Sequence, residues 1–312
     1  DKNERPGLQA LLKISKKETP LTVSDLVFGF GPLINAAGRL ADADRAVNLL
    51  IATTYDEATK QAAVLAERNK LRKEFDKRIV AEATEIIEND PMWEERDSIV
   101  LYQPHWHKGL VGIVAARITE RFHKPTIILT ESNGMAVGSA RTVKGFNIHQ
   151  AIASCDNLLV NFGGHAHAAG LTLHPTDITA FQDRFEGYVS THIHAEQLEP
   201  EIFVNAELPF QLIDENFMKL LKQFAPFGPA NRNPVFVSRQ VRDAGYSRIL
   251  TGNHLRLVVK QGDRIINGIA FGRGDDFLNV TTKEDFSICY TVEENKWKGE
   301  VRLQLMVKDL GF

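Results

Sequence analysis

The sequence predicts a chain of mixed class: a long helix leads into an α/β domain, and an all-β domain of five strands follows. Three observations carry this prediction. Apolar residues keep helical spacing over residues 54–91, strand-like and helix-like segments alternate over residues 98–195, and five short strand-like segments follow within residues 235–309. At 312 residues the chain is too long for one ordinary core, so two or three domains are expected.

Residues 1–53 are expected to be the C-terminal tail of a larger domain whose front is missing. They hold little apolar mass, and about 50 residues of this kind would not form an independent core. Arg39 follows a glycine within a turn and is either a functional cation or one partner of a surface ion pair. Asp42 and Asp44 are expected to cap the next helix.

Residues 54–91 are predicted to form a connector helix between two bodies. Thr54 and Glu57 have the spacing of a capping box at its start, and an Asn-Asp-Pro sequence at residues 89–91 ends it. The charged side chains of residues 67–77 predict that the middle of the helix is exposed to solvent.

Residues 92–197 are predicted to form the α/β domain. Residues 98–102 and 126–130 have the composition of buried strands, and residues 111–122 are predicted to form the helix between them. A shorter apolar helix pattern surrounds Ile148.

Residues 198–312 are predicted to form a five-stranded, partly open barrel of the OB-fold type. Residues 232–308 hold 13 Lys and Arg against 9 Asp and Glu, although the whole chain has a net charge of −3. This local excess has the sign that a polyanion requires. The expected strands are residues 235–241, 254–260, 264–271, 286–292 and 301–308, with turns at residues 262–263 and 295–299.

Aromatic and cationic side chains alternate along this barrel, and OB-folds use such side chains to hold single-stranded nucleic acid without reading its sequence. Half or more of the aromatic residues are expected in the core, because any small barrel needs them there. The aromatic residues are Phe236, Tyr246, Phe271, Tyr290 and Trp297, and the candidate nucleic-acid-binding residues are Arg239, His254, Arg256, Lys260, Phe271 and Arg273.

Two glycine-framed polar motifs stand out in the α/β domain, at residues 138–141 (Gly-Ser-Ala-Arg) and 163–170 (Gly-Gly-His-Ala-His-Ala-Ala-Gly). A Gly-Gly pair lets a ligand approach the backbone, and Ser139 and Arg141 add a hydroxyl and a cationic fork suited to phosphate oxygens. The Ala and Gly residues after His165 predict a close-packed helix whose N-terminus points at the same anion. One motif alone would favour a simple turn before a helix, whereas the two together favour a phosphate site, with His165 as a hydrogen-bond donor.

Metal, disulfide and membrane chemistry are not expected. Three His-x-His pairs, at residues 105/107, 165/167 and 192/194, lack a carboxylate-rich partner motif at metal-ligand spacing. Cys155 and Cys289 lie far apart in apolar patterns, which favours buried thiols in a reducing compartment. No apolar run reaches the length of a membrane span and no signal-peptide pattern opens the chain, so a cytoplasmic protein that does not bind membranes is expected.

These motifs resemble those of the RecJ family, the single-strand-specific 5′→3′ DNA exonucleases of the DHH phosphoesterase superfamily, and the resemblance covers nearly the whole chain. Residues 34–40 resemble the end of a DHH domain. Residues 105–115 resemble the opening of a DHHA1 domain. The two glycine-framed motifs are similar to the substrate motifs of that DHHA1 domain. Residues 224–234 and 252–255 are similar to the entry and first hairpin of the family's OB domain.

The resemblance implies the C-terminal part of a metal-dependent exodeoxyribonuclease of DNA repair and recombination. It implies that His165 is a catalytic residue near the scissile or adjacent phosphate, and that substrate phosphates are held by Arg39, Ser139, Arg141, Gly163 and Gly164. The family's two-metal centre, with Mn²⁺ or Mg²⁺, is built from Asp-rich and Asp-His-His motifs that are absent from these residues. The chain alone is therefore expected to bind no metal and to be inactive.

The resemblance also implies single-stranded DNA as the substrate, a single-strand-binding protein or a helicase as protein partner, and a monomeric state. Leu33 departs from the family, in which many members carry Arg at this position. Two alternatives remain open. The first is a DHH/DHHA1 oligoribonuclease or cyclic-dinucleotide phosphodiesterase, although such proteins usually lack a barrel like that of residues 235–309. The second is a non-catalytic single-strand-binding module.

Overall fold

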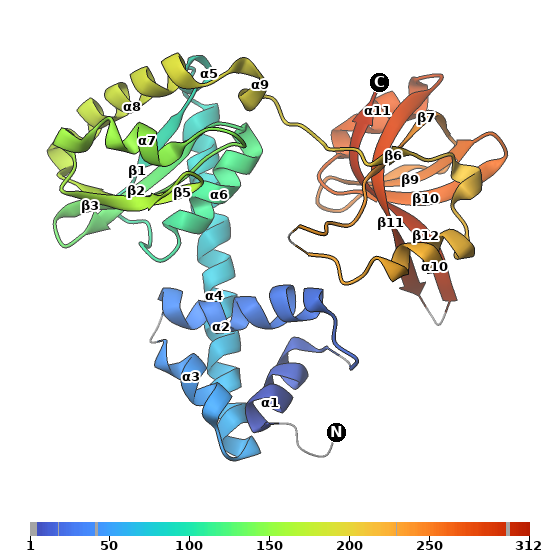
Figure 1. The fold of residues 1–312 in the computed structure, drawn as a ribbon, viewed down its shortest axis with the longest axis horizontal. Helices are drawn as coiled ribbons and strands as arrows, with labels where there is room; N and C mark the ends of the chain where they lie inside the picture. The colour runs from blue at the N-terminus through green and yellow to red at the C-terminus, as the bar shows by residue number, and fades with distance from the viewer. Residues whose placement is uncertain (1–4, 18, 41–42, 229, 298–299) are drawn as a thin grey trace. The chain divides into compact units, whose positions relative to one another are not determined.

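A computed structural model describes residues 5–17, 19–40, 43–228, 230–297 and 300–312. The chain divides into two compact units, residues 1–200 and residues 201–312, and Figure 1 shows the elements of each. The α/β and all-β classes predicted from the sequence are both present, so the predicted fold class is confirmed. No helix among the described residues is long and apolar enough to cross a membrane.

The first helices of the chain pack around the N-terminal half of a long helix, α4 (Tyr55–Glu88). Their shared core includes Leu11, Leu49 and Leu65, all of which are fully buried. The described residues before α4 thus share a core with α4 and form no separate core. Asp42 lies outside the described residues, and Asp44 lies in the first turn of its helix and does not cap it. The elements are α1 (Pro6–Ser15), the π-helix η1 (Asp25–Phe30), α2 (Gly31–Leu40) and α3 (Asp44–Ile51).

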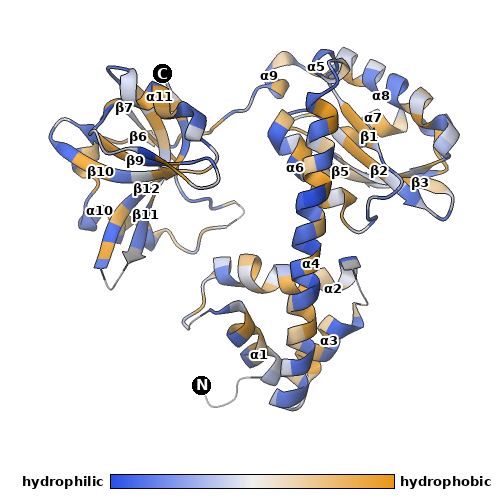
Figure 2. Ribbon diagram, turned by 180° about the vertical axis from the view of Figure 1, so that it is seen from behind, coloured by the Kyte–Doolittle hydropathy of each residue, from blue (hydrophilic) through white to orange (hydrophobic). Residues whose placement is uncertain are grey.

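The helix α4 begins and ends where the sequence predicts. The Oγ1 atom of Thr54 accepts a hydrogen bond from the backbone N–H of Glu57, at 3.3 Å. The prediction that the charged middle is solvated is wrong for one face, because Asn69 and Asp76 are only 8% and 1% exposed. Figure 2 shows that this middle stretch is nevertheless hydrophilic, between two more apolar ends. A buried polar layer therefore interrupts the apolar stripe of α4.

The α/β domain is a five-stranded sheet with the strand order β1-β2-β3-β5-β4. Strands β1 and β2 are parallel and are joined by the predicted helix α6, whereas the remaining neighbours are antiparallel. The elements are β1 (Ile99–Tyr102), α6 (Val111–Phe122), β2 (Thr126–Ser132), β3 (Met135–Arg141), β4 (Asn161–His165) and β5 (Ala168–Leu173).

Helices cover the two faces of this sheet unequally. One face packs against α7 and α8 through residues such as Ile152, Phe181 and Phe185. The other face packs against α6 and α4, with Ile99 and Ile128 in that core. The covering and connecting helices are α5 (Met92–Glu95), α7 (Ile148–Ala153), η2 (Asp156–Leu158), η3 (Pro175–Asp177), α8 (Ile178–His192) and α9 (Ala195–Leu198).

The prediction of a helix after His165 is wrong, because the residues that follow His165 form β5, which pairs with β4 in a β-hairpin. Along β5 the side chains of Ala169, Leu171 and Leu173 enter the core, whereas Gly170 between them is exposed. This period of two is that of a strand. Ala and Gly fit helices and close-packed strands alike, so the composition alone could not decide between them.

The second unit is a closed barrel, in which the strand order β7-β11-β12-β10-β9 is completed by pairing of β7 with β9. Strands β10 and β12 are parallel and the other barrel pairs are antiparallel. All five predicted strands are present, and β11 continues to Trp297 through part of the turn predicted at residues 295–299. The elements are β6 (Ala206–Glu207), η4 (Phe210–Leu212), α10 (Glu215–Gln223), β7 (Phe236–Asp243), β8 (Arg248–Leu250), β9 (His254–Gln261), β10 (Arg264–Ala270), η5 (Gly274–Asp276), α11 (Phe277–Thr282), β11 (Phe286–Trp297) and β12 (Glu300–Gly311).

A buried tyrosine in the barrel core predicts a pH dependence of stability. The hydroxyl of Tyr290 lies 2.7 Å from the Oγ atom of Ser238 and donates to the carbonyl oxygen of Leu208. Burial raises the pKa of Tyr290 from 10.0 to about 12. Because the folded barrel favours the neutral phenol, this stabilisation is complete below pH ~10 and is lost as the pH rises toward 12.

Between about pH 9.5 and 11, the free energy of unfolding of the wild-type chain should therefore fall by about 1 kcal/mol more than that of the Tyr290→Phe variant. Denaturant unfolding of both proteins at a series of pH values measures the difference. Parallel pH profiles would contradict the prediction.

Candidate nucleic-acid-binding site

The strand register brings the two glycine-framed motifs together. Strands β3 and β4 both pair with β5, so that Ser139, Gly170 and Gly163 lie in one row across the sheet. Two residues farther along these strands, Arg141, Ala168 and His165 lie in a parallel row. Side chains directly opposite each other on paired strands share one face of a sheet, and so do residues two apart on a strand. The serine, the arginine and the histidine therefore share a face that is floored by small residues.

This face is open beyond α6. Gly163, His165 and Gly170 are exposed, while Ala140 and Ala169 on the other face are buried. A Cβ atom built on Gly163 would meet no heavy atom of the described residues within 4 Å. A ligand can therefore approach the backbone of β4 and β5 closely.

Ser139 and Arg141 form the cationic edge of this open face. The guanidinium Nη1 of Arg141 donates to the Oγ atom of Ser139 at 2.8 Å and to the carbonyl oxygen of Ala140 at 2.7 Å. A Cβ atom on Gly112, in the first turn of α6, would lie 3.1 Å from both side chains. Burial lowers the pKa of Arg141, and the positive charge of Arg39 lowers it further. The guanidinium is thus partly desolvated beside a second cation, an environment that an anion would stabilise.

Arg39 reaches this edge from the N-terminal helices. Its Nη1 atom donates to the carbonyl oxygen of Gly109, at 3.2 Å, in the loop before α6. A Cβ atom on Gly109 would lie only 2.2 Å from the carbonyl oxygen of Arg39, so the two backbones meet there. Within the described part of the chain, no side chain caps the N-terminus of α6, which adds its own partial positive charge.

His165 is oriented by its own turn. Its Nδ1 atom accepts a hydrogen bond from the backbone N–H of His167, at 3.2 Å. In the neutral imidazole the proton then resides on Nε2, which remains able to donate to an oxygen outside the protein. This geometry is suited to a group that hydrogen-bonds a phosphate oxygen.

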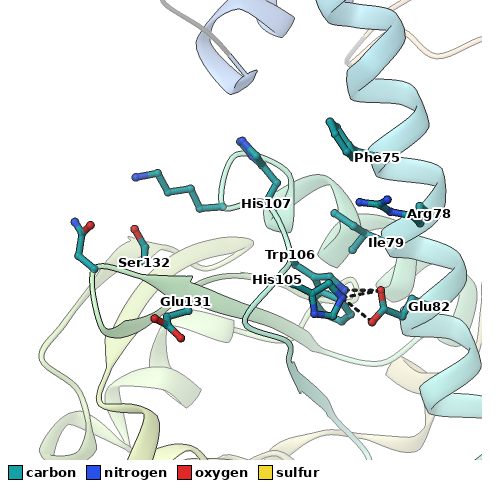
Figure 3. Close-up of a pocket in the computed structure, with 11 residues that line it drawn as sticks. Phe75, Arg78, Ile79, Glu82, His105, Trp106, His107, Glu131 and Ser132 are labelled. Carbon is teal, nitrogen blue, oxygen red and sulfur yellow. Dashed lines mark hydrogen bonds and ion pairs between the residues drawn. The ribbon is translucent and has the colours of Figure 1, made fainter.

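The pair His105 and His107 lies in the loop between β1 and α6, beside a pocket of about 430 Å³. Figure 3 shows Glu82 of α4 reaching this loop. Its Oε2 atom accepts hydrogen bonds from Trp106 Nε1 at 3.0 Å and from His105 Nε2 at 3.1 Å. Burial opposes ionisation of Glu82, but these hydrogen bonds outweigh it, so its pKa is lowered. Glu82 thereby anchors the loop that carries Gly109.

The described residues do not fit a two-metal centre. Among them, no three His, Cys, Asp or Glu side chains are grouped so that they could hold a metal ion. A two-metal site needs several carboxylate and imidazole ligands around each ion. The described residues therefore supply no ligand set for metal-assisted hydrolysis.

A second cationic surface lies on the barrel. Arg248, Arg256 and Arg302 line a hollow of about 750 Å³ together with Asn267 and Gln304. Arg248 and Arg256 are directly paired across β8 and β9. We call this hollow, which is lined by the three arginines, the barrel groove. Arg302 also pairs with Glu300 at 2.6 Å, so its charge is partly compensated.

The structure separates the six barrel residues predicted to bind nucleic acid. Arg256 lies in the barrel groove, whereas Lys260 is exposed farther along the same strand. His254 packs edge-on against the exposed ring of Phe271, with 5.0 Å between ring centroids. Arg239 on β7 pairs with Glu207.

Arg273 is bound by two carboxylates, Asp276 and Asp309, and its charge is thereby neutralised within the barrel. Of the aromatic candidates, Phe236 and Tyr290 belong to the core, while Tyr246 and Phe271 are exposed. The side chain of Trp297 lies outside the described part of the chain.

The buried polar residues of α4 were not predicted from the sequence. Asn69, Arg72 and Asp76 continue the stripe of buried residues along the helix, and Asp76 forms an ion pair with Arg117 of α6 at 2.9 Å. Their helical spacing, in phase with apolar residues on both sides, is the signal that could have revealed them.

Two family models match the chain. One, described as the DHHA1 domain, matches residues 97–191, and the other, described as the RecJ OB domain, matches residues 204–309. The chain is 32% identical to a protein named single-stranded-DNA-specific exonuclease RecJ from Dickeya dadantii, over 98% of this chain and 54% of that protein. The protein of the same name from Bacillus subtilis is 29% identical over 99% of this chain and 39% of its own length.

Solved structures agree with these relatives. RecJ from Thermus thermophilus in complex with Mg²⁺ matches with a TM-score of 0.84 and 26% identity, over 100% of this chain and 47% of that one. An exonuclease RecJ bound to manganese matches 60% of this chain and 46% of its own, with a TM-score of 0.53 and 28% identity. The chain thus spans about half the length of the curated relatives that it matches: the alignment covers 54% of the Dickeya protein.

Proposed function

Because this chain belongs to the RecJ family, we propose that it supplies the strand-binding surfaces of a metal-dependent 5′→3′ single-stranded DNA exonuclease that acts in DNA repair and recombination. The alignment of Ser139 and Arg141 with Gly163 and His165 across β5 carries this proposal. The catalytic Mn²⁺ or Mg²⁺ ions would be held by the part of the relatives that this chain does not match.

At the phosphate site, each group has a separate role. Ser139 and Arg141 donate hydrogen bonds to the oxygens of one phosphate, and Arg39 adds a second cationic donor beside them. The Gly163–Gly164 backbone lets that phosphate lie against the sheet. The Nε2 atom of His165 donates to an oxygen on which negative charge develops as the phosphodiester bond breaks.

In the second unit, the barrel groove is proposed to hold the strand away from the reacting end. Its arginines neutralise phosphates, and the exposed rings of Tyr246 and Phe271 are available for stacking on bases. The match to the RecJ OB domain supports this proposal over the alternative of an oligoribonuclease or cyclic-dinucleotide phosphodiesterase, whose members usually lack a barrel.

The chain alone is expected to bind single-stranded DNA without degrading it in Mg²⁺ or Mn²⁺, and to bind it mainly through the barrel groove. Replacing Arg248, Arg256 and Arg302 by Gln should reduce the log–log slope of affinity against salt by up to about 2, at about 0.7 for each phosphate that is no longer neutralised. Titration of a fluorescent oligonucleotide at several salt concentrations measures this slope.

The matched control removes the same charge from the ion-paired cations Arg121, Lys222 and Arg242, which lie outside the groove. It should leave the slope nearly unchanged. Equal effects of the two triple variants would contradict the barrel groove as the main DNA contact. Binding that is insensitive to salt would contradict binding through phosphates at either site. Metal-dependent digestion of the oligonucleotide by this chain would refute the proposal that the metal ions are held by the part of the relatives that the chain does not match.

A further inference from the structure

The buried polar layer of α4 lies between two apolar cores. On its N-terminal side Leu65 belongs to the core of the first helices, and on its C-terminal side Ile79 belongs to the core of the α/β domain. Asn69, the half-buried Arg72 and Asp76 occupy the same stripe between them. Buried polar side chains in a helix stripe cost stability unless they are paired, so their presence here requires an explanation.

The hydrogen bonds within the layer leave donor atoms of Arg72 without a partner among the described residues. Arg72 donates through Nε to the Oδ1 atom of Asn69, at 3.0 Å, and its two terminal nitrogens make no hydrogen bond to the described residues. Asp76 pairs through Oδ2 with Arg117 at 2.9 Å. An ion pair whose only role was to join α4 to α6 would not need a second arginine beside it.

The charges around Arg72 are also unbalanced. Burial lowers its pKa, the positive charges of Arg39 and Arg117 act in the same direction, and Asp76 is the only carboxylate of the described residues that opposes them. Arg39 acts in the same way on Arg141 of the phosphate site. The positive charge of Arg39 therefore acts on both Arg72 and Arg141. Mutual repulsion of this kind is relieved when an anion binds.

We propose that Arg72 belongs to a second phosphate subsite, which adjoins the Ser139–Arg141 site across Arg39, and that Asp76 is the positioning residue that holds Arg72 and Arg117 there. This inference rests on the proposed function, because it assumes that one phosphate of the strand occupies the first site. The subsite takes the neighbouring phosphodiester of the same strand. Arg39, between the two, contributes to both.

The test compares two ligands that differ by one phosphodiester group, thymidine 5′-monophosphate and the 5′-phosphorylated dinucleotide pdTpdT. Each is titrated into the 312-residue chain without metal, and binding is followed by NMR. Arg72→Gln should weaken pdTpdT about 10-fold, the usual effect of losing a hydrogen bond to a charged group, and change the mononucleotide less than about twofold. Arg141→Gln should weaken both ligands. Arg72→Lys should recover part of the preference for pdTpdT.

Asp76→Asn should reduce the preference for pdTpdT in the same direction, because Arg72 and Arg117 lose the charge that orients them. Thermal unfolding establishes whether this variant is folded, and if it is not, the two Arg72 variants decide the question. The matched control, Arg121→Gln, removes an exposed charge of α6 that pairs with Glu88 and should change neither affinity.

Equal loss of both ligands in Arg72→Gln, or no loss of either, would overturn the second subsite while leaving the proposed function intact. Failure of the wild-type chain to bind either ligand would overturn the phosphate site, and the second subsite with it.

Discussion

Replacing His165 by Ala in a complete exonuclease that contains this chain is expected to lower kcat by about 100- to 1,000-fold while changing the Kd for single-stranded DNA by less than about threefold. A preorganised donor that meets charge only in the transition state typically contributes about 3 kcal/mol to the barrier. The Nδ1 atom of His165 is occupied by the N–H of His167, so the proton on Nε2 is the one available to the substrate.

Single-turnover kinetics with a 5′-phosphorylated oligonucleotide separate the chemical step from binding. The control is His174→Ala, an exposed histidine in the loop that follows β5. An unchanged rate in the His165 variant would reduce the Gly-Gly-His sequence to a turn element. A loss confined to affinity would make His165 a binding residue and not a catalytic one.

Replacing Gly164 by Ala is expected to destabilise the chain by about 3 kcal/mol and to disrupt the β4–β5 hairpin. Gly164 has φ of +152°, and a Cβ atom there would lie 2.3 Å from the carbonyl oxygen of Ala168 and 2.5 Å from the Cα atom of Ala169. Backbone atoms on the paired strand cannot move aside without breaking the register that aligns His165 with Arg141.

Gly163→Ala is the matched control, because a Cβ atom there meets no atom of the described residues and points to the open face. It should change the free energy of unfolding by less than about 1 kcal/mol, yet weaken substrate binding by occupying space that the phosphate requires. Denaturant unfolding and oligonucleotide titration of both variants test the pair. Equal stabilities for the two variants would mean that the hairpin tolerates a side chain at residue 164.

The long helix, the helix at residues 111–122 and the five barrel strands could be predicted from the sequence to within a few residues, whereas β3, β4 and β5 were not predicted as strands. The helix at residues 111–122 has the predicted bounds, and the five barrel strands occur in the predicted order. Their apolar periodicity is a local property, since it depends only on which residues must face a core. The residue types of the proposed phosphate site were also visible, because two glycine-framed motifs with Ser, Arg and His occur in one domain.

Local signals failed where the residues are small or where a partner lies far along the chain. The Ala and Gly residues after His165 fit a helix as well as a strand, and only pairing with β3 and β4 decides for the strand. Arg273 looked like a free cation, but Asp309, 36 positions later, neutralises it (309 − 273 = 36). The charged middle of α4 looked solvated because charged residues are usually exposed, and the helical spacing of Asp76 does not identify its distant partner Arg117 on α6.

The sequence by itself therefore determined the class of the fold, the order of the barrel strands and the kinds of side chain that could hold a phosphate. Which of those side chains meet was decided by the tertiary structure alone. Arg39 approaches Arg141 because two backbones touch at Gly109, and His165 faces the same side as Ser139 because three strands share one register. Apolar periodicity follows from the side on which a segment is buried, whereas charge balance and ligand geometry depend on distances between residues remote in sequence, and only the folded chain sets those distances.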